Sequence, residues 1–496
     1  TLVQPFLISR LLAPPPQDLV ALTFILPPSD ASPAPASNLP TPHLRLYTNR
    51  RQRNPVAGVF TLNPTDNMKL LHAPLAPVTA WLLRGGRTAC RPTQGCGRRS
   101  FSSSFEPSED HAMLRKMVRD FAEKEVDPQA NEFNRDERFN RALFRKLGAD
   151  LGLIGITVPE EYGGSMLDAA AVCIAHEELS AADPAFCLSY LAHSLLFVNN
   201  LARNGSNAQK AEFLPRACSG EIVGGMCMSE PNAGTDVLSM ATRAKRDGGD
   251  FILNGTKMWI TNGTLDGTTT GDVFLVYAKT EKGLSLFIVE KGTKGFTLGQ
   301  QIKDKCGMRA SPTAELVFDN VRVPAANLVG EEGKAVGCMM RNLEIERLGL
   351  AAMSCGIARR SVERMAKYAG ERKQFGNTLI SFGQIQRLLA DSYSAMSAGR
   401  ALLYSTAAKV DFDKPPVPGS NTRVETDAVK LFCGKMAKDC ADSAIQVLGG
   451  NGYVGEYQVE RLWRDSKLLE IGGGTNEAHH KNIARDLSRA GTHAIP

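Results

Sequence analysis

The spacing of hydrophobic residues predicts helices in the first part of the body of the chain. Met113, Met117 and Phe121 recur four residues apart with charged residues between them, as on one face of a helix. Three later segments have similar spacing, at residues 144–151, 169–180 and 188–204. Pro184 and Gly205 are expected to interrupt this helical region.

The pattern then changes to short runs that are rich in β-branched and aromatic residues. These runs lie at residues 251–253, 273–277 and 284–289. Turn-forming dipeptides at 254–255, 282–283 and 291–292 are expected to separate them. Residues 315–318 and 321–323 are predicted to form a hairpin around Asp319-Asn320. The middle region is therefore predicted to be a small antiparallel β domain.

Long helical patterns return in the last part of the chain. They occupy residues 343–356, 357–368, 384–408 and 428–448, which are lengths typical of a four-helix bundle. The polar segment 413–421 is predicted to be a loop. The order of elements predicts an α+β fold with an N-terminal helical domain, a middle antiparallel β domain and a C-terminal four-helix bundle. The expected boundaries are 106–225, 226–335 and 336–496.

Residues 1–105 differ from the rest in composition. They hold 15 of the 27 prolines and carry a net charge of +8, so the remaining residues sum to −2 although the whole chain is +6. The basic charge thus belongs to this leader, and the body gives no electrostatic reason to expect nucleic-acid binding. A proline-rich segment with few acidic residues cannot bury a core. Its arginine- and serine-rich end favours a transit peptide, with a misassigned gene start or a native disordered tail as alternatives.

The body also gives little sign of a membrane span or a metal centre. No run of about 18 consecutive apolar residues is present, so we expect no membrane span. The 11 cysteines lack metal-ligand spacing, and Cys173 and Cys355 have apolar neighbours typical of buried thiols. His479 and His480 are adjacent, which on a helix directs their side chains about 100° apart and makes a poor metal site.

Two segments carry the strongest functional signal. Residues 226–236 read MCMSEPNAGTD, and residues 258–263 read MWITNG. The first is a hydroxyl- and glycine-rich turn whose backbone N–H groups are available to a heterocycle or a pyrophosphate. The second places the large aromatic face of Trp259 beside it. A polar hairpin loop next to a core tryptophan is the alternative for either segment alone.

These segments resemble the two flavin-contacting segments of the acyl-CoA dehydrogenase family. The similarity extends from about residue 108 to 487 and includes RKQFG at 372–376, GGNGY at 449–453 and GTNE at 474–477. The resemblance implies FAD as cofactor, an acyl-CoA substrate and α,β-dehydrogenation of the thioester. It also implies an electron-transferring flavoprotein as acceptor, a homotetramer and the mitochondrial matrix.

The catalytic base is expected to lie away from the position that most family members use. Most members place a glutamate directly before a Gly-Thr near the C-terminus, where this chain has Gly473. The isovaleryl-CoA branch of the family places the base on the first long helix of the C-terminal domain, in a context that matches Leu343-Glu344-Ile345-Glu346-Arg347. The match assigns the base to Glu346. Because residues two apart do not share a helix face, Glu344 and Glu346 cannot both enter the pocket.

The remaining assignments also follow from the resemblance. The flavin ring and its ribityl chain are expected to contact Met226, Cys227, Met228, Ser229, Glu230, Pro231, Asn232, Ala233, Gly234, Thr235, Trp259, Ile260 and Thr261. The adenosine end is expected to contact Gln446, Val447, Leu448, Gly449, Gly450, Thr475, Asn476 and Glu477, and Arg372 is expected to reach FAD phosphate in a neighbouring subunit. The substrate is expected to border Thr235, Glu344, Ile345, Glu346, Arg347, Gly473 and Gly474.

The resemblance favours a short branched-chain substrate, with isovaleryl-CoA oxidised to 3-methylcrotonyl-CoA in leucine breakdown. The absence of a side chain at Gly473 is expected to leave room for a branched acyl group. The chain departs from that branch at 281–283 and Gly337, which leaves other short, medium or branched acyl-CoA substrates open. It also departs at Gly383, which concerns only the FAD contact between subunits. A catalytically inactive FAD- or acyl-CoA-binding paralogue and an acyl-CoA oxidase are further alternatives.

Overall fold

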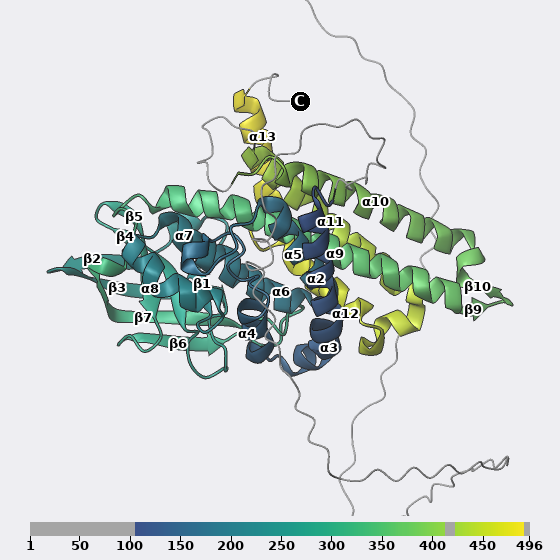
Figure 1. Ribbon diagram of the computed structural model, residues 1–496, viewed down its shortest axis with the longest axis horizontal. Helices are drawn as coiled ribbons and strands as arrows, with labels where there is room; N and C mark the ends of the chain where they lie inside the picture. Colours follow the sequence, from purple (N-terminus) through teal and green to yellow (C-terminus); the bar gives the residue numbers. More distant parts are fainter. Residues whose placement is uncertain (1–104, 412–421, 491–496) are drawn as a thin grey trace, which may run out of the picture. The chain divides into compact units, whose positions relative to one another are not determined.

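A computed structural model describes residues 105–411 and 422–490 of the chain (Figure 1). The predicted order of a helical region, a β region and a second helical region is confirmed. Two predicted segments lie outside the described residues. They are the leader, except for its last residue, and the whole of the predicted loop at 413–421.

The first helical region contains seven α-helices within the described residues, joined by short or irregular turns. Its elements are α2 (Glu109–Phe121), the π-helix η1 (Ala122–Val126), α3 (Asp127–Asp136), α4 (Arg141–Ala149), η2 (Glu160–Tyr162), α5 (Ala169–Ala182), α6 (Pro184–Leu191), the π-helix η3 (Ala192–Asn199), α7 (Asn200–Asn204) and α8 (Asn207–Cys218). The predicted interruptions are confirmed, because Asp183 caps α6 directly before Pro184 and α7 ends directly before Gly205.

The core face of α2 is shifted from the predicted one. Met113 is 43% exposed, whereas Leu114, Arg115 and Val118 are buried together with Phe121. The shift has an electrostatic cause, because the Arg115 guanidinium donates hydrogen bonds to two buried glutamates of α5. A charged residue thus takes a core position that the hydrophobic pattern assigned to its neighbours.

The run from Pro184 to Asn204 is the one helical segment in the described part of the chain that is long and apolar enough to cross a membrane. Its most apolar window is 94% buried inside the protein, as in the core helix of a folded domain. His193 lies within this run and its ring fastens the run to the sheet, because its Nδ1 accepts the Gly224 N–H at 2.8 Å.

The middle region is one mixed sheet that is mostly antiparallel. Its strands are β1 (Gly224–Cys227), β2 (Arg243–Asp247), β3 (Asp250–Thr261), β4 (Val273–Thr280), β5 (Gly283–Glu290), β6 (Phe296–Gln301), β7 (Thr313–Pro324) and β8 (Leu328–Val329). Their order is β6-β7-β3-β2-β4-β5-β8, with β1 beside β4. The pairs β1–β4 and β2–β4 are parallel, which corrects the expectation of a purely antiparallel domain.

Two predicted turns of this domain are wrong because bulges absorb them. Asn254-Gly255 lies inside β3, and Asp319-Asn320 lies inside β7, so no hairpin forms there. The two strands pair along their lengths with a register shift at Asn254, whose side chain accepts the backbone N–H of Asn320. Asn320 adopts a φ of 50°, a conformation that asparagine tolerates better than most residues.

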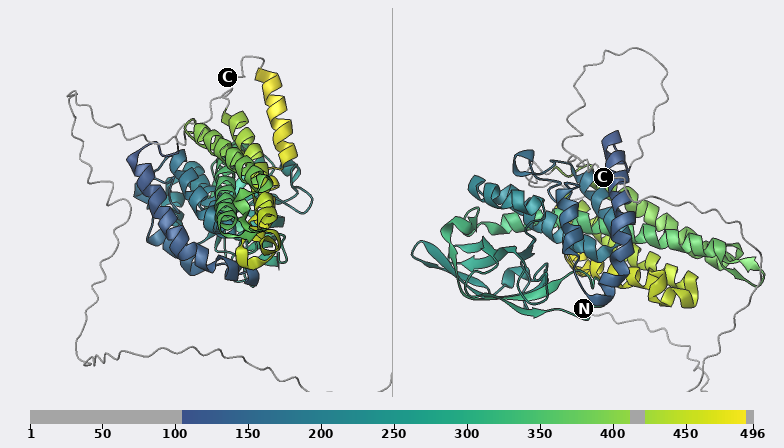
Figure 2. Two further views of the ribbon diagram at one scale, coloured as in Figure 1. Left: turned by 90° about the vertical axis from the view of Figure 1, so that its right-hand side faces the viewer. Right: turned by 60° about the horizontal axis from the view of Figure 1, so that its bottom comes forward.

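The last region is built on three long helices that pack side by side (Figures 1 and 2). Its elements are α9 (Ala335–Glu371), β9 (Lys373–Gln374), β10 (Asn377–Thr378), η6 (Leu379–Ser381), α10 (Gly383–Ala407), α11 (Thr422–Leu448), η7 (Gly449–Tyr453), η8 (Gly455–Tyr457), α12 (Val459–Ser466), η9 (Lys467–Glu470) and α13 (Asn476–Ala490); the short η4 (Val237–Ser239) and η5 (Ala325–Asn327) belong to the sheet region.

The predicted division of the first long helix at Gly356 is wrong, because α9 is continuous through it. A Cβ at Gly356 would overlap the Ser180 hydroxyl and the Glu177 carbonyl of α5. Gly356 therefore allows close approach of two helices and does not end one. As a result α9 is packed against α5, α10 and α11 at once, and it can hold a side chain rigidly between the domains.

Candidate functional site

Glu346 lies on the buried face of α9, in the first third of the helix. It is 9% exposed, and its Oε2 atom has no hydrogen-bond partner in the described structure. Burial raises the pKa of this carboxyl to about 7, and the positive charges of Arg347 and Lys430 oppose the increase. Glu344 is only half-buried, although burial raises its pKa as well. The structure thus distinguishes the two carboxylates, with Glu346 as the buried one.

The glycine turn at 472–474 lies directly against this carboxylate. Gly473 has a φ of 67°, and a Cβ built on it would lie 3.6 Å from Glu346 Cδ and 3.7 Å from Oε1. The position where most family members carry a glutamate and the side chain of Glu346 therefore reach the same space. The expected free volume beside Gly473 is absent, because that Cβ would overlap Leu350 Cδ1. Leu350 is buried and fills the space that we expected a branched acyl group to use.

The two segments that carry the sequence signal are adjacent in space. The Met258 N–H donates to the Ser229 carbonyl at 2.9 Å, which joins the loop after β1 to the end of β3. A register shift between Lys257 and Ile260 interrupts the pairing of β3 with β7. At this bulge Trp259 has a φ of 64° and is 62% exposed. A bulge turns a side chain out of the sheet, and a strained, exposed tryptophan is unusual unless it contacts a ligand or a partner.

Within the first segment, the side chains have separate roles. The buried Glu230 carboxylate accepts the Thr242 N–H and the Lys257 ammonium, so it braces the loop from inside. Cys227 and Ile260 are buried in the core of the sheet, and any contact they make to a ligand would use their backbone. The exposed residues of the segment are Pro231, Asn232, Gly234, Thr235 and Asp236, with Met228 and Ser229 partly exposed. These exposed groups and Trp259 form the accessible part of the site.

A contact between β1 and α9 connects these segments to Glu346. The Asn342 side-chain amide lies 3.9 Å from Met226 Sδ, and Asn342 is four residues before Glu346 on the same helix face. The Asn342 Oδ1 is buried and unpartnered, like Glu346 Oε2. The start of the first segment is therefore one helical turn away from the carboxylate.

Three polar residues near Glu346 were not expected from the sequence. Asp427 and Lys430 lie three residues apart on α11, and His479 lies in the first turn of α13; each is at most 1% exposed. Asp427 accepts hydrogen bonds from Arg347 at 2.9 Å and from His479 at 2.7 Å, and Lys430 donates to the Gly474 carbonyl at 2.6 Å. Two charges three residues apart within the apolar pattern of 427–437 are the signal that would have found this pair.

The predicted start of a helix at 475–477 is confirmed. Thr475 accepts the Ala478 N–H with its hydroxyl, directly before α13 begins at Asn476, and Glu477 is exposed beside it. These residues follow the glycine turn and lie at the same end of α11 as Lys430.

The other residues predicted for the adenosine end lie far from Glu346 in this chain. Arg372 follows the end of α9, about 39 Å from Glu346 at 1.5 Å per helical residue. Gly449 and Gly450 follow the end of α11, about 28 Å beyond Lys430 by the same rise. The two places are close to each other, because Asn451 donates a hydrogen bond to Tyr368 at 2.9 Å. Gln446 is exposed there, whereas Val447 and Leu448 are buried.

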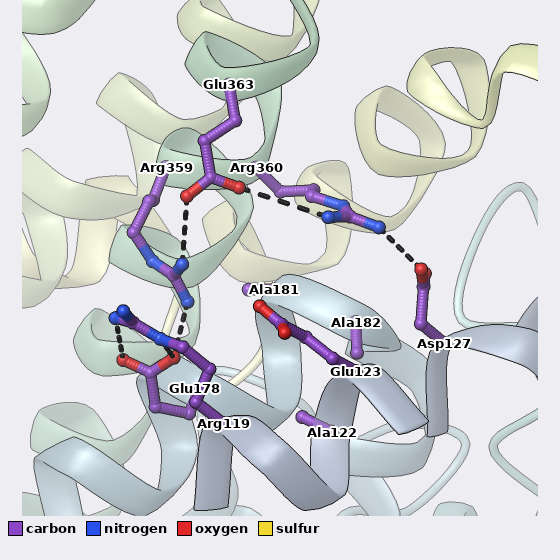
Figure 3. Close-up of a pocket in the computed structure, with 10 residues that line it drawn as sticks. All are labelled: Arg119, Ala122, Glu123, Asp127, Glu178, Ala181, Ala182, Arg359, Arg360 and Glu363. Atoms are coloured by element: carbon purple, nitrogen blue, oxygen red, sulfur yellow. Dashed lines mark hydrogen bonds and ion pairs between the residues drawn. The ribbon is translucent and has the colours of Figure 1, made fainter. Parts of the chain in front are cut away.

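A pocket between α2, α5 and α9 contains charged side chains but does not suit an anionic ligand. Figure 3 shows Arg119 and Arg359 directed at Glu178, with Arg359 also paired to Glu363 and Arg360 paired to Asp127. The acidic side chains that line this pocket outnumber its three arginines. All three arginines thus form ion pairs with these acidic side chains, and the ion pairs hold the helices together.

Comparison with known proteins identifies the class. Family models described as the N-terminal, middle and C-terminal domains of acyl-CoA dehydrogenase match residues 108–221, 225–321 and 334–488. The three matches and the helical–β–helical fold define an oxidoreductase that acts on acyl-CoA. The chain belongs to the acyl-CoA dehydrogenase family.

Individual relatives support the same assignment without selecting one substrate. The chain is 42% identical to mitochondrial isovaleryl-CoA dehydrogenase of Oryza sativa subsp. japonica, over 80% of this chain and 96% of that protein. It is also 42% identical to mitochondrial 2-methylacyl-CoA dehydrogenase of Solanum tuberosum, over 78% of this chain and 93% of that protein. The solved structure of a glutaryl-CoA dehydrogenase from Mycobacterium smegmatis in complex with FADH2 is 31% identical to this chain, with a TM-score of 0.72. The match covers 78% of this chain and 96% of that one.

Proposed function

We propose that this protein is an FAD-dependent dehydrogenase that introduces an α,β double bond into a short branched-chain acyl-CoA, with Glu346 as the base. The observation that carries the proposal is the position of Glu346. It is a buried carboxylate with a pKa raised to about 7, and it lies against the glycine where most family members carry their own base. A base with a pKa near neutral is strong enough to remove an α-proton and is still ionised in the cell.

The described residues also fit a bound flavin. The exposed Trp259 ring offers a face for stacking, and the mostly exposed loop at 231–235 beside it offers backbone donors and the Thr235 hydroxyl. Trp259, Thr261 and the loop would hold the ring and ribityl chain of FAD. When bound, FAD would accept hydride from the β-carbon of the substrate, which no protein side chain can do.

The residues of the chain would carry out the proton half of the reaction. Glu346 would take the α-proton on its free Oε2, and its burial would exclude water from the proton-transfer step. Arg347 and Lys430 oppose the rise in its pKa and so keep part of the carboxylate ionised. Gly473 and Gly474, which lie against the carboxylate, would border the thioester.

The adenosine end of FAD would require a second copy of the chain. Arg372 and 446–450 are too far from Glu346 to contact the same cofactor molecule within one chain. An apolar groove between α9 and α10, lined by Val362, Ala366, Leu389 and Tyr393, lies beside the same end of the molecule. These features support an assembly of copies of this chain in which the far end of one subunit completes the cofactor site of another, and from the family resemblance we propose that the assembly is a homotetramer. Sedimentation of the FAD-loaded protein, with Leu389→Asp as the variant, would test this assembly.

The relatives favour a branched substrate but leave two candidates. Isovaleryl-CoA branches at the β-carbon and 2-methylacyl-CoA at the α-carbon, and the relatives named for them have equal identity to this chain. We propose isovaleryl-CoA as the substrate and electron-transferring flavoprotein as the acceptor. The proposed location is the mitochondrial matrix, where leucine breakdown would produce isovaleryl-CoA. A panel of isovaleryl-, 2-methylbutyryl- and butyryl-CoA with a dye or electron-transferring flavoprotein as acceptor would rank the substrates.

Glu346→Gln tests the base directly. Glutamine keeps the shape of the side chain but cannot take the proton, so the variant is expected to retain FAD and lose about 10²- to 10⁴-fold in turnover. Glu344→Gln is the matched control and is expected to stay active. Substantial turnover by Glu346→Gln would reject the assignment. Failure of the wild-type protein to reduce its flavin with any acyl-CoA would instead support an inactive binding protein.

A further inference from the structure

A buried polar cluster fastens the glycine turn and the helix that carries Glu346 to α11. Lys430 donates to the Gly474 carbonyl at 2.6 Å, and Gly474 follows the residue that lies against the Glu346 carboxyl. Asp427, one turn earlier on α11, accepts from Arg347, the residue after Glu346. Two neighbouring side chains of α11 thus hold both the glycine turn and the part of α9 that carries Glu346.

The charges of this cluster balance only when Glu346 is ionised. Arg347 and Lys430 are positive, and Asp427 is negative, so an ionised Glu346 makes the cluster neutral and a protonated one leaves it with a charge of +1. Burial lowers the pKa of Lys430 to about 8, and Glu346 is the first of the charges that oppose the decrease. Burial also lowers the pKa of His479, which favours a neutral ring that donates its Nδ1–H to Asp427.

Other ionisable groups near Glu346 have less effect on its ionisation than Arg347 and Lys430. They are Glu344 on α9, Glu470 in η9, and His176 on α5. Glu344 is partly exposed, Glu470 is paired with Lys467, and burial lowers the pKa of His176 to about 4, so that its ring is neutral. Among the described residues, Lys430 is therefore the buried cation on a neighbouring helix whose charge acts on the Glu346 carboxyl.

We propose that Lys430 is a positioning residue for Glu346: it holds the Gly473–Gly474 turn against the carboxylate and keeps a positive charge beside it, which sets the pH range in which Glu346 is ionised. This role rests on the proposed function only where it concerns catalysis. The effect on the ionisation of Glu346 is a property of the protein alone.

The test is therefore a titration of Glu346 that needs no substrate. Infrared difference spectroscopy of the FAD-loaded protein follows the protonated carboxyl band as pH is varied, and the band is assigned by its loss in Glu346→Gln. Lys430→Met removes the charge and the hydrogen bond, Lys430→Gln removes the charge but keeps a donor, and Lys430→Arg keeps the charge. Removing the cation destabilises the ionised carboxylate, so the Met and Gln variants are expected to titrate about one pH unit higher or more.

A matched control separates this effect from the loss of any largely desolvated lysine that is hydrogen-bonded to the backbone. Lys305 also donates to a backbone carbonyl, that of Ser311 at 2.9 Å, and burial also lowers its pKa to about 8. Lys305→Met and Lys430→Arg are expected to leave the Glu346 midpoint near the wild-type value. An unchanged midpoint in both Lys430→Met and Lys430→Gln overturns the proposal. An equal upward shift in Lys430→Arg or Lys305→Met also overturns it, because general disruption would then be the cause.

The second readout is the pH profile of kcat/KM with the best substrate of the panel. The rising limb is expected to move upward in Lys430→Gln in step with the infrared midpoint, with the plateau at high pH largely retained. A lower plateau without displacement of the limb would assign Lys430 a merely structural role and overturn the proposal. If the titration behaves as expected while no acyl-CoA is oxidised, the proposed function fails and the role of Lys430 stands.

Discussion

Replacing Gly473 by alanine measures how tightly the pocket around Glu346 is packed. The backbone φ of 67° at this residue costs a non-glycine residue about 1–2 kcal/mol. The added methyl group would overlap Leu350 Cδ1, and overpacking of a core costs about 1–3 kcal/mol. Because Leu350 is only 2% exposed, it has little room to move aside. We therefore expect Gly473→Ala to lower the free energy of unfolding by about 2–5 kcal/mol.

Two control variants divide this loss into backbone strain and steric overlap. Gly248 has a φ of 61° with no atom within 4 Å of its Cβ position, so Gly248→Ala reports the strain alone, about 1–2 kcal/mol. Gly472 has no positive φ and its nearest contact is 3.5 Å, so Gly472→Ala is expected to change stability by no more than about 0.5 kcal/mol. The assay is guanidinium unfolding of the three variants, followed by circular dichroism. If Gly473→Ala is no less stable than Gly248→Ala, then Leu350 yields and the pocket is not tightly packed.

Three further predictions concern the reaction and the cofactor. The kcat/KM is expected to rise as pH increases through about 7, because Glu346 takes a proton only when ionised and burial raises its pKa to that value; a flat profile across neutral pH would contradict this. Trp259→Gly is expected to fold at least as stably as the wild type, since glycine tolerates a φ of 64°, but to lose FAD on gel filtration. An unchanged ratio of flavin to protein absorbance would show that Trp259 does not hold FAD. Gly473→Glu is expected to slow the oxidation of branched and straight acyl-CoA alike, because the new side chain would overlap Leu350 and place a second carboxylate beside Glu346. If only the branched substrate were slowed in the same kinetic panel, Gly473 would after all provide room for a branched acyl group.

The sequence predicted the order of domains and the pairing of Glu346 with Gly473, because both depend on local pattern or on motifs. It failed where a residue acts on a distant segment. The sequence pattern predicts a helix end at Gly356, whereas the absence of a side chain there allows the contact with α5, more than 170 residues earlier in the chain. The sequence likewise predicts a turn at Asn320, whereas the residue lies in a bulge that depends on Asn254 of another strand, which a local pattern does not reveal.

The polar cluster on α11 was missed for the same physical reason. A buried charge is recognisable only with its partners, and those of Asp427 are Arg347 and His479 on two other helices. The same holds for Lys430, whose acceptor is a backbone carbonyl that no side-chain pattern reveals. Motif comparison found the residues that the family shares, whereas contacts formed by tertiary packing needed the structure.

The contacts around Gly473 explain why the base cannot be assigned from one position alone. A side chain at residue 473 would point at the Glu346 carboxyl and overlap Leu350, which lies one helical turn after Glu346 on α9. Two carboxylates at these positions would repel each other and raise the pKa of at least one of them. Glu346, Leu350 and Gly473 therefore depend on one another sterically and electrostatically, and placing a carboxylate at 473 instead of 346 would require changes at all three positions. A glycine at 473 by itself is thus no sign of an inactive protein, because the space that a base would fill there already contains the carboxylate of Glu346.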